Sequence, residues 1–165
     1  MRLKLSNFAN DILYMSSEKP SYLLSLFTNR CPRCRRGDIF QTKKAYALKN
    51  NRYMKMHDHC PLCGQATDLE VGFYYGTGYV SYGITMFLSG VSFVLWWILI
   101  GISADDNRVF WWLGINTFLL IILQPPLMRF SRTLWLSWFV KYDPNWEKER
   151  APEPERIVKE QMGNW

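Results

Sequence analysis

Four cysteines, in two pairs of identical spacing, are the residues of this chain best suited to chemistry. The pairs are Cys31-Pro-Arg-Cys34 and Cys60-Pro-Leu-Cys63. Two tight Cys-x-x-Cys turns can place four sulfurs tetrahedrally around one ion, as in zinc ribbons. The proline after each first cysteine fixes φ in its turn, and Gly64 permits a positive φ where the chain leaves the second turn. The spacing therefore predicts a metal site whose ligands are Cys31, Cys34, Cys60 and Cys63.

The ion that this ligand set favours is Zn²⁺, and a single iron is the alternative, because four cysteine thiolates suit both metals. Four thiolates fill every coordination position, so the metal is expected to be structural. Arg33, Arg35 and Arg36 would offset the negative charge of the thiolates. His57 and His59, just before the second pair, are expected to be solvated rather than ligands.

Other uses of the cysteines fit less well. Disulfides are not expected on the cytoplasmic side of a membrane, where thiols stay reduced. A thioredoxin-like site needs one Cys-x-x-Cys in a βαβ setting, and covalent haem attachment needs a His directly after the pair. No catalytic constellation accompanies the cysteines, so the chain is not expected to be an enzyme and no catalytic residue is assigned.

The elements that must position the cysteines are short. Residues 38–40 and 53–56 alternate as strands do, and residues 49–52 suit the turn between them. Residues 29–70 are therefore expected to form a small β zinc ribbon. A core of this size is marginal without a staple, so the ion would supply much of the folding free energy.

Two stretches without Asp, Glu, Lys or Arg follow, over residues 71–104 and 109–128. About 20 apolar helical residues cross a hydrocarbon core, so transmembrane helices are expected at about 78–102 and 109–128. Pro125-Pro126 should kink or end the second helix, and residues 129–142 are expected to form a separate interfacial helix. Aromatic residues are expected to anchor the chain at the interfaces: Tyr74, Tyr75, Trp111, Trp112, Trp135 and Trp138.

One face of the first span carries small residues that would let the second span approach closely. The residues of this packing face are Ser81, Thr85, Ser89 and Ser92. Asn116 and Gln124 in the second span are expected to make hydrogen bonds between helices. Neither span contains an acid or a base that would mark an ion path, which argues against a transporter.

The termini complete the expected organisation. Residues 1–28 form a modestly amphipathic segment, and residues 143–165 form a polar tail. The chain has 20 Lys or Arg against 14 Asp or Glu, and the excess lies before the first span. The positive-inside rule then places both termini in the cytoplasm, in a multi-pass protein of the inner membrane. The expected fold is a membrane protein with an N-terminal β zinc ribbon, a two-helix transmembrane hairpin and an interfacial helix.

The cysteine pairs, followed by Gly72-Phe-Tyr-Tyr-Gly-Thr-Gly-Tyr-Val-Ser-Tyr82 and two spans, give the chain a recognisable layout. Over about residues 20–142 it resembles the domain-of-unknown-function 983 family of bacteria. This resemblance implies a cytoplasmic zinc ribbon joined to a membrane hairpin, and no established activity. Some members are encoded beside genes for respiratory oxidase assembly, which suggests by association a respiratory setting.

Three functions remain open on these grounds. The first is a non-catalytic accessory or assembly subunit of a larger membrane complex, whose partners are membrane lipid and other protein subunits. The second is a metal-handling or electron-transfer protein that serves a membrane oxidase. The third is a membrane-tethered nucleic-acid binder, which is less favoured because basic residues beside a span more often face anionic lipid.

Overall fold

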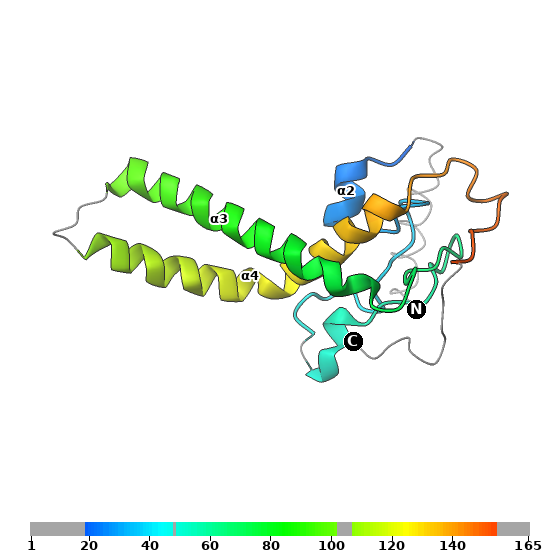
Figure 1. Ribbon diagram of the computed structural model, residues 1–165, viewed down its shortest axis with the longest axis horizontal. Coiled ribbons are helices and arrows are strands. Elements are labelled where there is room, and N and C mark those ends of the chain that lie inside the picture. Colours follow the sequence, from blue (N-terminus) through cyan, green and yellow to red (C-terminus); the bar gives the residue numbers. More distant parts are fainter. Residues whose placement is uncertain (1–18, 48, 102–106, 155–165) are drawn as a thin grey trace, which may run out of the picture.

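A computed structural model of the chain describes residues 19–47, 49–101 and 107–154 (Figure 1). The predicted amphipathic segment over residues 1–18, the turn at 102–106 and the tail beyond 154 lie outside these residues. The described part is mostly helical. A long helical hairpin ends in a small module that contains the four cysteines, and we call residues 29–70 the cysteine module.

The first long helix, α3 (Thr77–Ile100), follows a short 3₁₀ helix, η2 (Phe73–Gly76). Its sequence has neither charge nor proline to interrupt it. The helix ends at Gly101, which has φ 80° and whose N–H bonds to the carbonyl of Trp97 at 3.0 Å. From Phe73 to Ile100 the mean hydropathy reaches 2.0, and none of the most apolar stretch is buried inside the protein.

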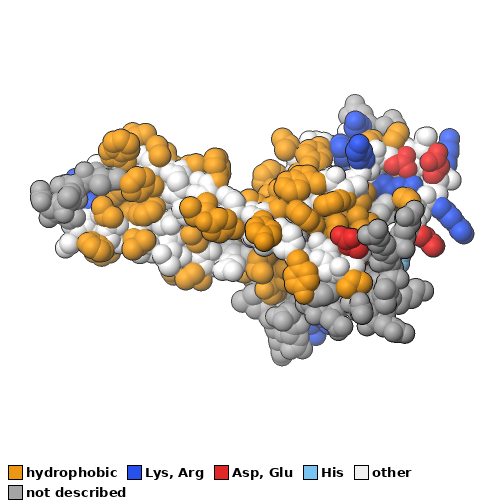
Figure 2. All heavy atoms as spheres, in the orientation of Figure 1, with side chains coloured by type: hydrophobic (Ala, Val, Ile, Leu, Met, Phe, Trp, Pro, Cys, Tyr) orange, Lys and Arg blue, Asp and Glu red, His pale blue; other side chains and the backbone are white. Residues whose placement is uncertain are grey.

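The second long helix, α4 (Arg108–Phe139), packs along α3. It reaches a mean hydropathy of 1.4, so both helices are long and apolar enough to cross a membrane. The prediction of two helices with the length and composition needed to cross a membrane is therefore confirmed. A hairpin of this kind leaves apolar side chains outward along its length, as Figure 2 shows.

Of the two outcomes expected at Pro125-Pro126, a kink or an end, the structure has the kink, and the separate interfacial helix predicted after it is wrong. Pro125 and Pro126 lie inside α4, which continues to Phe139 without a separate interfacial helix over 129–142. Figure 1 shows that the axis of α4 changes direction at the yellow part of the ribbon, where these prolines lie. A proline at position i leaves the carbonyl of residue i−4 without its helical donor. The hydroxyl of Tyr46 donates to the carbonyl of Ile122 at 3.0 Å, so the cysteine module satisfies the group that Pro126 frees.

The predicted β strands are also absent from the part of the chain that the structure describes. Residues 38–40 and 53–56 meet in the single antiparallel bridge Phe40–Met56, beside bonds from Gln41 N–H to Lys55 O and from His57 N–H to Ile39 O. A 3₁₀ helix, η1 (Lys49–Met54), takes up the first two residues of the second predicted strand, Tyr53 and Met54. Pairing can therefore begin only at residue 55. The two other bridges are also isolated, and they join Arg30 to Asp38 and His59 to Ala66.

The core of the molecule is shared between the cysteine module and α4. Ile39 and Phe40 of the module lie with the cysteines, and Leu136 and Val140 of the α4 end complete the same buried cluster. Phe73 joins this cluster where the chain enters α3. The cysteine module is thus built onto the end of the hairpin rather than tethered to it.

Candidate metal centre

The two cysteine turns have the same backbone hydrogen bonds. In the first, Arg35 N–H bonds to Cys31 O at 2.7 Å, and in the second, Gly64 N–H bonds to Cys60 O at 2.9 Å. Each first cysteine also donates its own N–H at 2.8 Å, Cys31 to Gly37 O and Cys60 to Gln65 O. The chain leaves both turns through a left-handed residue. The matched turns place the cysteine side chains toward one common point.

Arg35 is the residue that sequence analysis missed in the first turn. Arg35 has a φ of 56° and takes the same place in the first turn that Gly64, with a φ of 69°, takes in the second. For a residue with a side chain, this left-handed conformation costs about 1–2 kcal/mol. The guanidinium lies over the ring of Tyr142 at 4.5 Å and donates to the carbonyl of Pro20 at 3.0 Å. These contacts offset the backbone cost, and they connect the first turn to the residues after α4.

Gly37 lets the two turns approach each other. A Cβ at this position would lie 2.3 Å from the sulfur of Cys60, well inside ordinary van der Waals contact. The N–H of Gly37 also points to the sulfur of Cys34 at 3.4 Å. Gly37 is therefore required for the contact between the two turns. In the sequence, Gly37 comes three residues after its cysteine pair, whereas Gly64 follows its pair directly.

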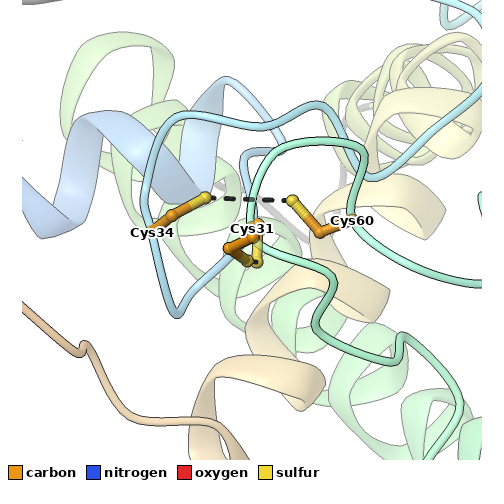
Figure 3. Close-up of side chains that lie close together, drawn as sticks. Cys31, Cys34 and Cys60 are labelled. Carbon is orange, nitrogen blue, oxygen red and sulfur yellow. Dashed lines mark hydrogen bonds between the residues drawn. The ribbon is translucent and has the colours of Figure 1, made fainter. Parts of the chain in front are cut away.

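The four sulfurs lie within 4.8 Å of one another. Figure 3 shows three of these side chains, Cys31, Cys34 and Cys60, close together, with the contact between Cys34 and Cys60 dashed. Two distances between turns are short, 3.7 Å from Cys31 to Cys63 and 3.8 Å from Cys34 to Cys60. Four ligands at a zinc–sulfur distance of about 2.3 Å, placed tetrahedrally, would have sulfurs about 3.8 Å apart. The donor set and its spacing therefore fit a metal with four thiolate ligands. The prediction that these cysteines form one cluster able to bind a metal ion is confirmed.

Burial and mutual hydrogen bonding shift the cysteine pKa values in opposite directions. The pKa of the Cys34 thiol lies below its ordinary value, because thiols of Cys31, Cys60 and Cys63 donate to its sulfur. The pKa of Cys31 is raised, because it donates to its neighbours and is buried. Because thiolates are the metal ligands, binding of an ion must release the protons that the cluster still holds, and the affinity for the ion rises with pH.

The cluster is closed on nearly every side. Exposed fractions are 1% for Cys31, 0% for Cys34, 2% for Cys60 and 8% for Cys63. His57 and His59 do not belong to the cluster of close ligand atoms. A metal in this position would have four protein ligands and no adjacent space for a substrate, except beside Cys63.

Arg33 connects the cluster to the residues that follow α4. It is only 4% exposed, and its guanidinium donates to the carbonyl of Cys63 at 3.2 Å and to that of Glu149 at 2.9 Å. It also forms an ion pair with Asp143 at 2.8 Å. These bonds lower the pKa of Asp143 below its usual range. Arg33 and the stacked Arg35 are therefore less available to an external anion than their sequence position suggests.

Two arginines of α4 attach the cysteine module to the hairpin. Arg129 donates to the carbonyl of Thr42 and lies 4.2 Å over the ring of Phe40. Arg132 approaches the carbonyl of Met54 at 3.4 Å and lies over a tyrosine ring at 5.0 Å. The sequence indicated only that these residues follow the second span.

The residues of the predicted packing face make contacts between α3 and α4 at two levels. Ser81 donates to the hydroxyl of Ser131 at 2.9 Å. Further along, Ser92 donates to the amide oxygen of Asn116 at 2.9 Å, and the amide nitrogen of Asn116 donates to Ser89 at 3.3 Å. The hydroxyl of Thr85, the other residue of the predicted face, donates to carbonyls of its own helix.

The predicted aromatic anchors separate into two groups. Tyr75, Trp111 and Trp138 are exposed, as an interfacial residue would be. Tyr74, Trp112 and Trp135 instead donate hydrogen bonds to protein atoms, to Thr67 O, Ser92 Oγ and Phe73 O respectively. Trp135 packs so closely on Gly76 that a Cβ there would lie 2.2 Å from its ring.

The fold and the site define a class of protein: a helical hairpin able to cross a membrane, with a four-cysteine cluster able to bind a metal at one end. No protein-family model, curated protein or solved structure matches the chain. Its function must therefore be argued from its own residues.

Proposed function

We propose that the chain is a non-catalytic accessory or assembly subunit of a larger complex in the bacterial inner membrane, with a structural zinc in its cysteine module on the cytoplasmic side. The observation that carries this proposal is the closed cluster of four buried cysteines in the core that the module shares with α4. A metal there would determine the shape of a surface at the end of the hairpin. It would not meet a substrate.

The hairpin supports the same proposal. Residues 77–100 of α3 and 109–128 of α4 contain no acid or base for an ion path, and Asn116, a buried amide of α4, bonds to Ser89 and Ser92 of α3. The polar groups inside the hairpin therefore serve helix packing. Two helices alone leave most of their apolar surface outward, where lipid or the helices of other subunits can pack.

Basic residues support the proposed orientation. The excess of Lys and Arg precedes α3, and Arg129 and Arg132 lie at the same end of the hairpin. The positive-inside rule then assigns this end to the cytoplasm, where thiols stay reduced and can bind zinc. The resemblance to the domain-of-unknown-function 983 family agrees with this arrangement and adds the suggestion of a respiratory complex.

The test is extraction of a tagged, full-length copy from its native membrane in mild detergent, with mass spectrometry of the proteins that co-purify and metal analysis of the chain. The expected result is a stoichiometric companion complex and stoichiometric zinc. A chain that purifies alone with its metal bound would overturn the accessory-subunit proposal. Stoichiometric iron with a ferric-thiolate absorption would replace zinc by iron in the proposal.

A matched variant separates the role of the metal from that of the hairpin. Cys60→Ser leaves three thiolates and should lower zinc content and protein level together, because the ion contributes to folding. Leu62→Ser, in the same turn but exposed, should leave both unchanged. Normal abundance and normal zinc in Cys60→Ser would contradict a structural site.

One observation favours a second candidate, a metal-handling or electron-transfer protein that serves an oxidase. Cys63 borders an open cavity of about 530 Å³ between the second cysteine turn and residues 146–154, with His59 at its edge. A metal could leave or enter from this side. Zinc that passes to a chelator within minutes, or an iron that changes oxidation state reversibly, would favour this candidate over a structural site.

A further inference from the structure

The short helix before the cysteines has its apolar side turned outward. Helix α2 (Tyr22–Phe27) buries Ser25 and Leu26 against the rest of the protein. Leu23, Leu24 and Phe27 are 63%, 57% and 70% exposed. At 100° per residue these three side chains share one face of the helix. A helix on the surface of a soluble domain has polar residues on this face, so the outward face of α2 is suited to an apolar environment.

Contacts with α4 fix the position of α2 along the hairpin. The ring of Phe27 stacks on that of Phe130 with centroids 5.1 Å apart, and the hydroxyl of Tyr22 bonds to that of Ser137 at 3.0 Å. Helix α2 therefore lies beside the last turns of α4, as Figure 1 shows.

The length of α3 places this contact at the edge of a membrane. Ser131, the neighbour of Phe130, bonds to Ser81 of α3. Ser81 and Ile100 are separated by about 28 Å of helix rise, at about 1.5 Å per residue. A hydrocarbon core is about 30 Å thick. If Ile100 lies at one boundary of this core, then Ser81, Phe130 and the stacked Phe27 lie at the other.

The charge around α2 matches a lipid surface. Residues 19–70 contain ten Lys or Arg and four Asp or Glu. Figure 2 shows hydrophobic side chains that continue from the hairpin onto the end of the molecule where α2 lies, with Lys and Arg side chains near them. Apolar side chains beside basic ones are typical of a surface that binds an anionic leaflet. The apolar side chains enter the acyl-chain layer, and the basic side chains face the anionic headgroups.

We propose that Leu23, Leu24 and Phe27 insert among the acyl chains of anionic phospholipid, in the leaflet at the cysteine-module end of the hairpin. Helix α2 then forms a third membrane contact after α3 and α4. It presses the first cysteine turn, which begins four residues after Phe27, against the membrane surface. The proposal rests on the placement of the hairpin in a membrane and is independent of the partner complex.

The test places the photoreactive residue p-benzoylphenylalanine at Leu23 or at Phe27 of the full-length protein. The protein is reconstituted in vesicles of phosphatidylethanolamine and phosphatidylglycerol, irradiated and analysed by mass spectrometry. Met86, in the middle of α3, is the positive control, and Leu62, on the second cysteine turn, is the negative control. The two control residues are 56% and 55% exposed, slightly less than Leu23 at 63% and Phe27 at 70%.

The expected result is addition of a phospholipid mass at positions 23 and 27, because an inserted face contacts acyl chains continuously. The crosslinking yield at these positions should be within about threefold of the yield at position 86 and about tenfold above the yield at position 62. A yield at positions 23 and 27 no higher than at position 62 would overturn the proposal. Crosslinks to residues 1–18, or to a second protein in native membranes, would overturn it too. A lipid adduct at position 86 alone would show that the hairpin is inserted and that only the proposal for α2 fails. Stoichiometric zinc in each variant is the check that it has folded.

Discussion

Gly37→Ala should weaken metal binding specifically, because the new methyl group would occupy the space of a ligand atom. The Cβ would lie 2.3 Å from the sulfur of Cys60, so the sulfur must move by about an ångström to reach ordinary contact at 3.4 Å. Without metal, rotation of the Cys60 side chain relieves this clash. With metal, the sulfur is fixed, since zinc–sulfur distances vary by only about 0.2 Å.

The magnitude follows from the loss of one thiolate in four. Structural zinc contributes about 10–16 kcal/mol in small zinc domains, so one ligand corresponds to about 2.5–4 kcal/mol. At 1.4 kcal/mol per decade, the zinc affinity should fall by about 10²–10³. The measurement is competition of the purified full-length protein with a chromophoric chelator, together with thermal unfolding in the presence and absence of zinc.

Gly64→Ala is the matched control, because it is also a glycine at the exit of a cysteine turn. No atom lies within 4 Å of its Cβ position, and only the left-handed φ of 69° opposes a side chain. This costs about 1–2 kcal/mol, or about a factor of ten in affinity. Arg35 already adopts the equivalent conformation in the first turn. Equal losses in the two variants, or wild-type affinity in Gly37→Ala, would refute the reasoning.

Three further predictions concern the contacts around the module and between the spans. Tyr46→Phe removes the donor to the carbonyl of Ile122 and should destabilise the protein by about 0.5–1.5 kcal/mol, measured by unfolding in detergent; no change would show that water replaces the hydroxyl. Asn116→Leu removes hydrogen bonds between the spans and should cost about 1–2 kcal/mol in the same assay, whereas a gain would show that apolar packing suffices. Asp143→Asn should speed protease cleavage of residues 144–154 at neutral pH. Because Arg33 lowers the pKa of Asp143, the stability that this ion pair contributes is present above the ordinary carboxyl pKa and is lost as the pH falls through the lowered pKa. The cleavage rate of the wild-type protein should therefore approach that of the variant only in acid.

The cysteine cluster and the two long apolar helices could be predicted because each depends on a local pattern. Two Cys-x-x-Cys turns have few other ways to satisfy their backbone and their sulfurs, and a charge-free stretch of this length has few environments other than a membrane. In both cases the residues that determine the structure lie within one short stretch of the sequence. No distant residue is needed to recognise it.

The sequence left open whether Pro125-Pro126 would kink or end the second helix, because the partner that permits α4 to continue is far away in sequence. The rule that proline ends a helix assumes that the freed carbonyls have no other donor. Tyr46 supplies one from the cysteine module. The prediction of strands was wrong for a related reason. Helix η1 includes Tyr53 and Met54, which alternate as a strand would, and the backbone pairing around the cluster consists of isolated bridges.

The residues around the cluster were missed because their roles depend on tertiary contacts. The sequence predicted only that Arg33 and Arg35 offset the charge of the thiolates. In the structure Arg33 is buried and Arg35 is stacked on an aromatic ring. The signal that could have identified Arg35 is its position, which matches that of Gly64 after the other cysteine pair.

The attachment of the cysteine module to α4 also sets an order of events during translation. All four cysteines are available once Cys63 has left the ribosome, but Arg129 and Arg132, which bind the module, are made about 70 residues later, which takes several seconds at about 5–20 residues per second. The thiols can therefore gather their ion first and wait as a separate unit. Docking becomes possible only when α4 has been made to its end, so the docked module marks a chain whose helical hairpin is complete.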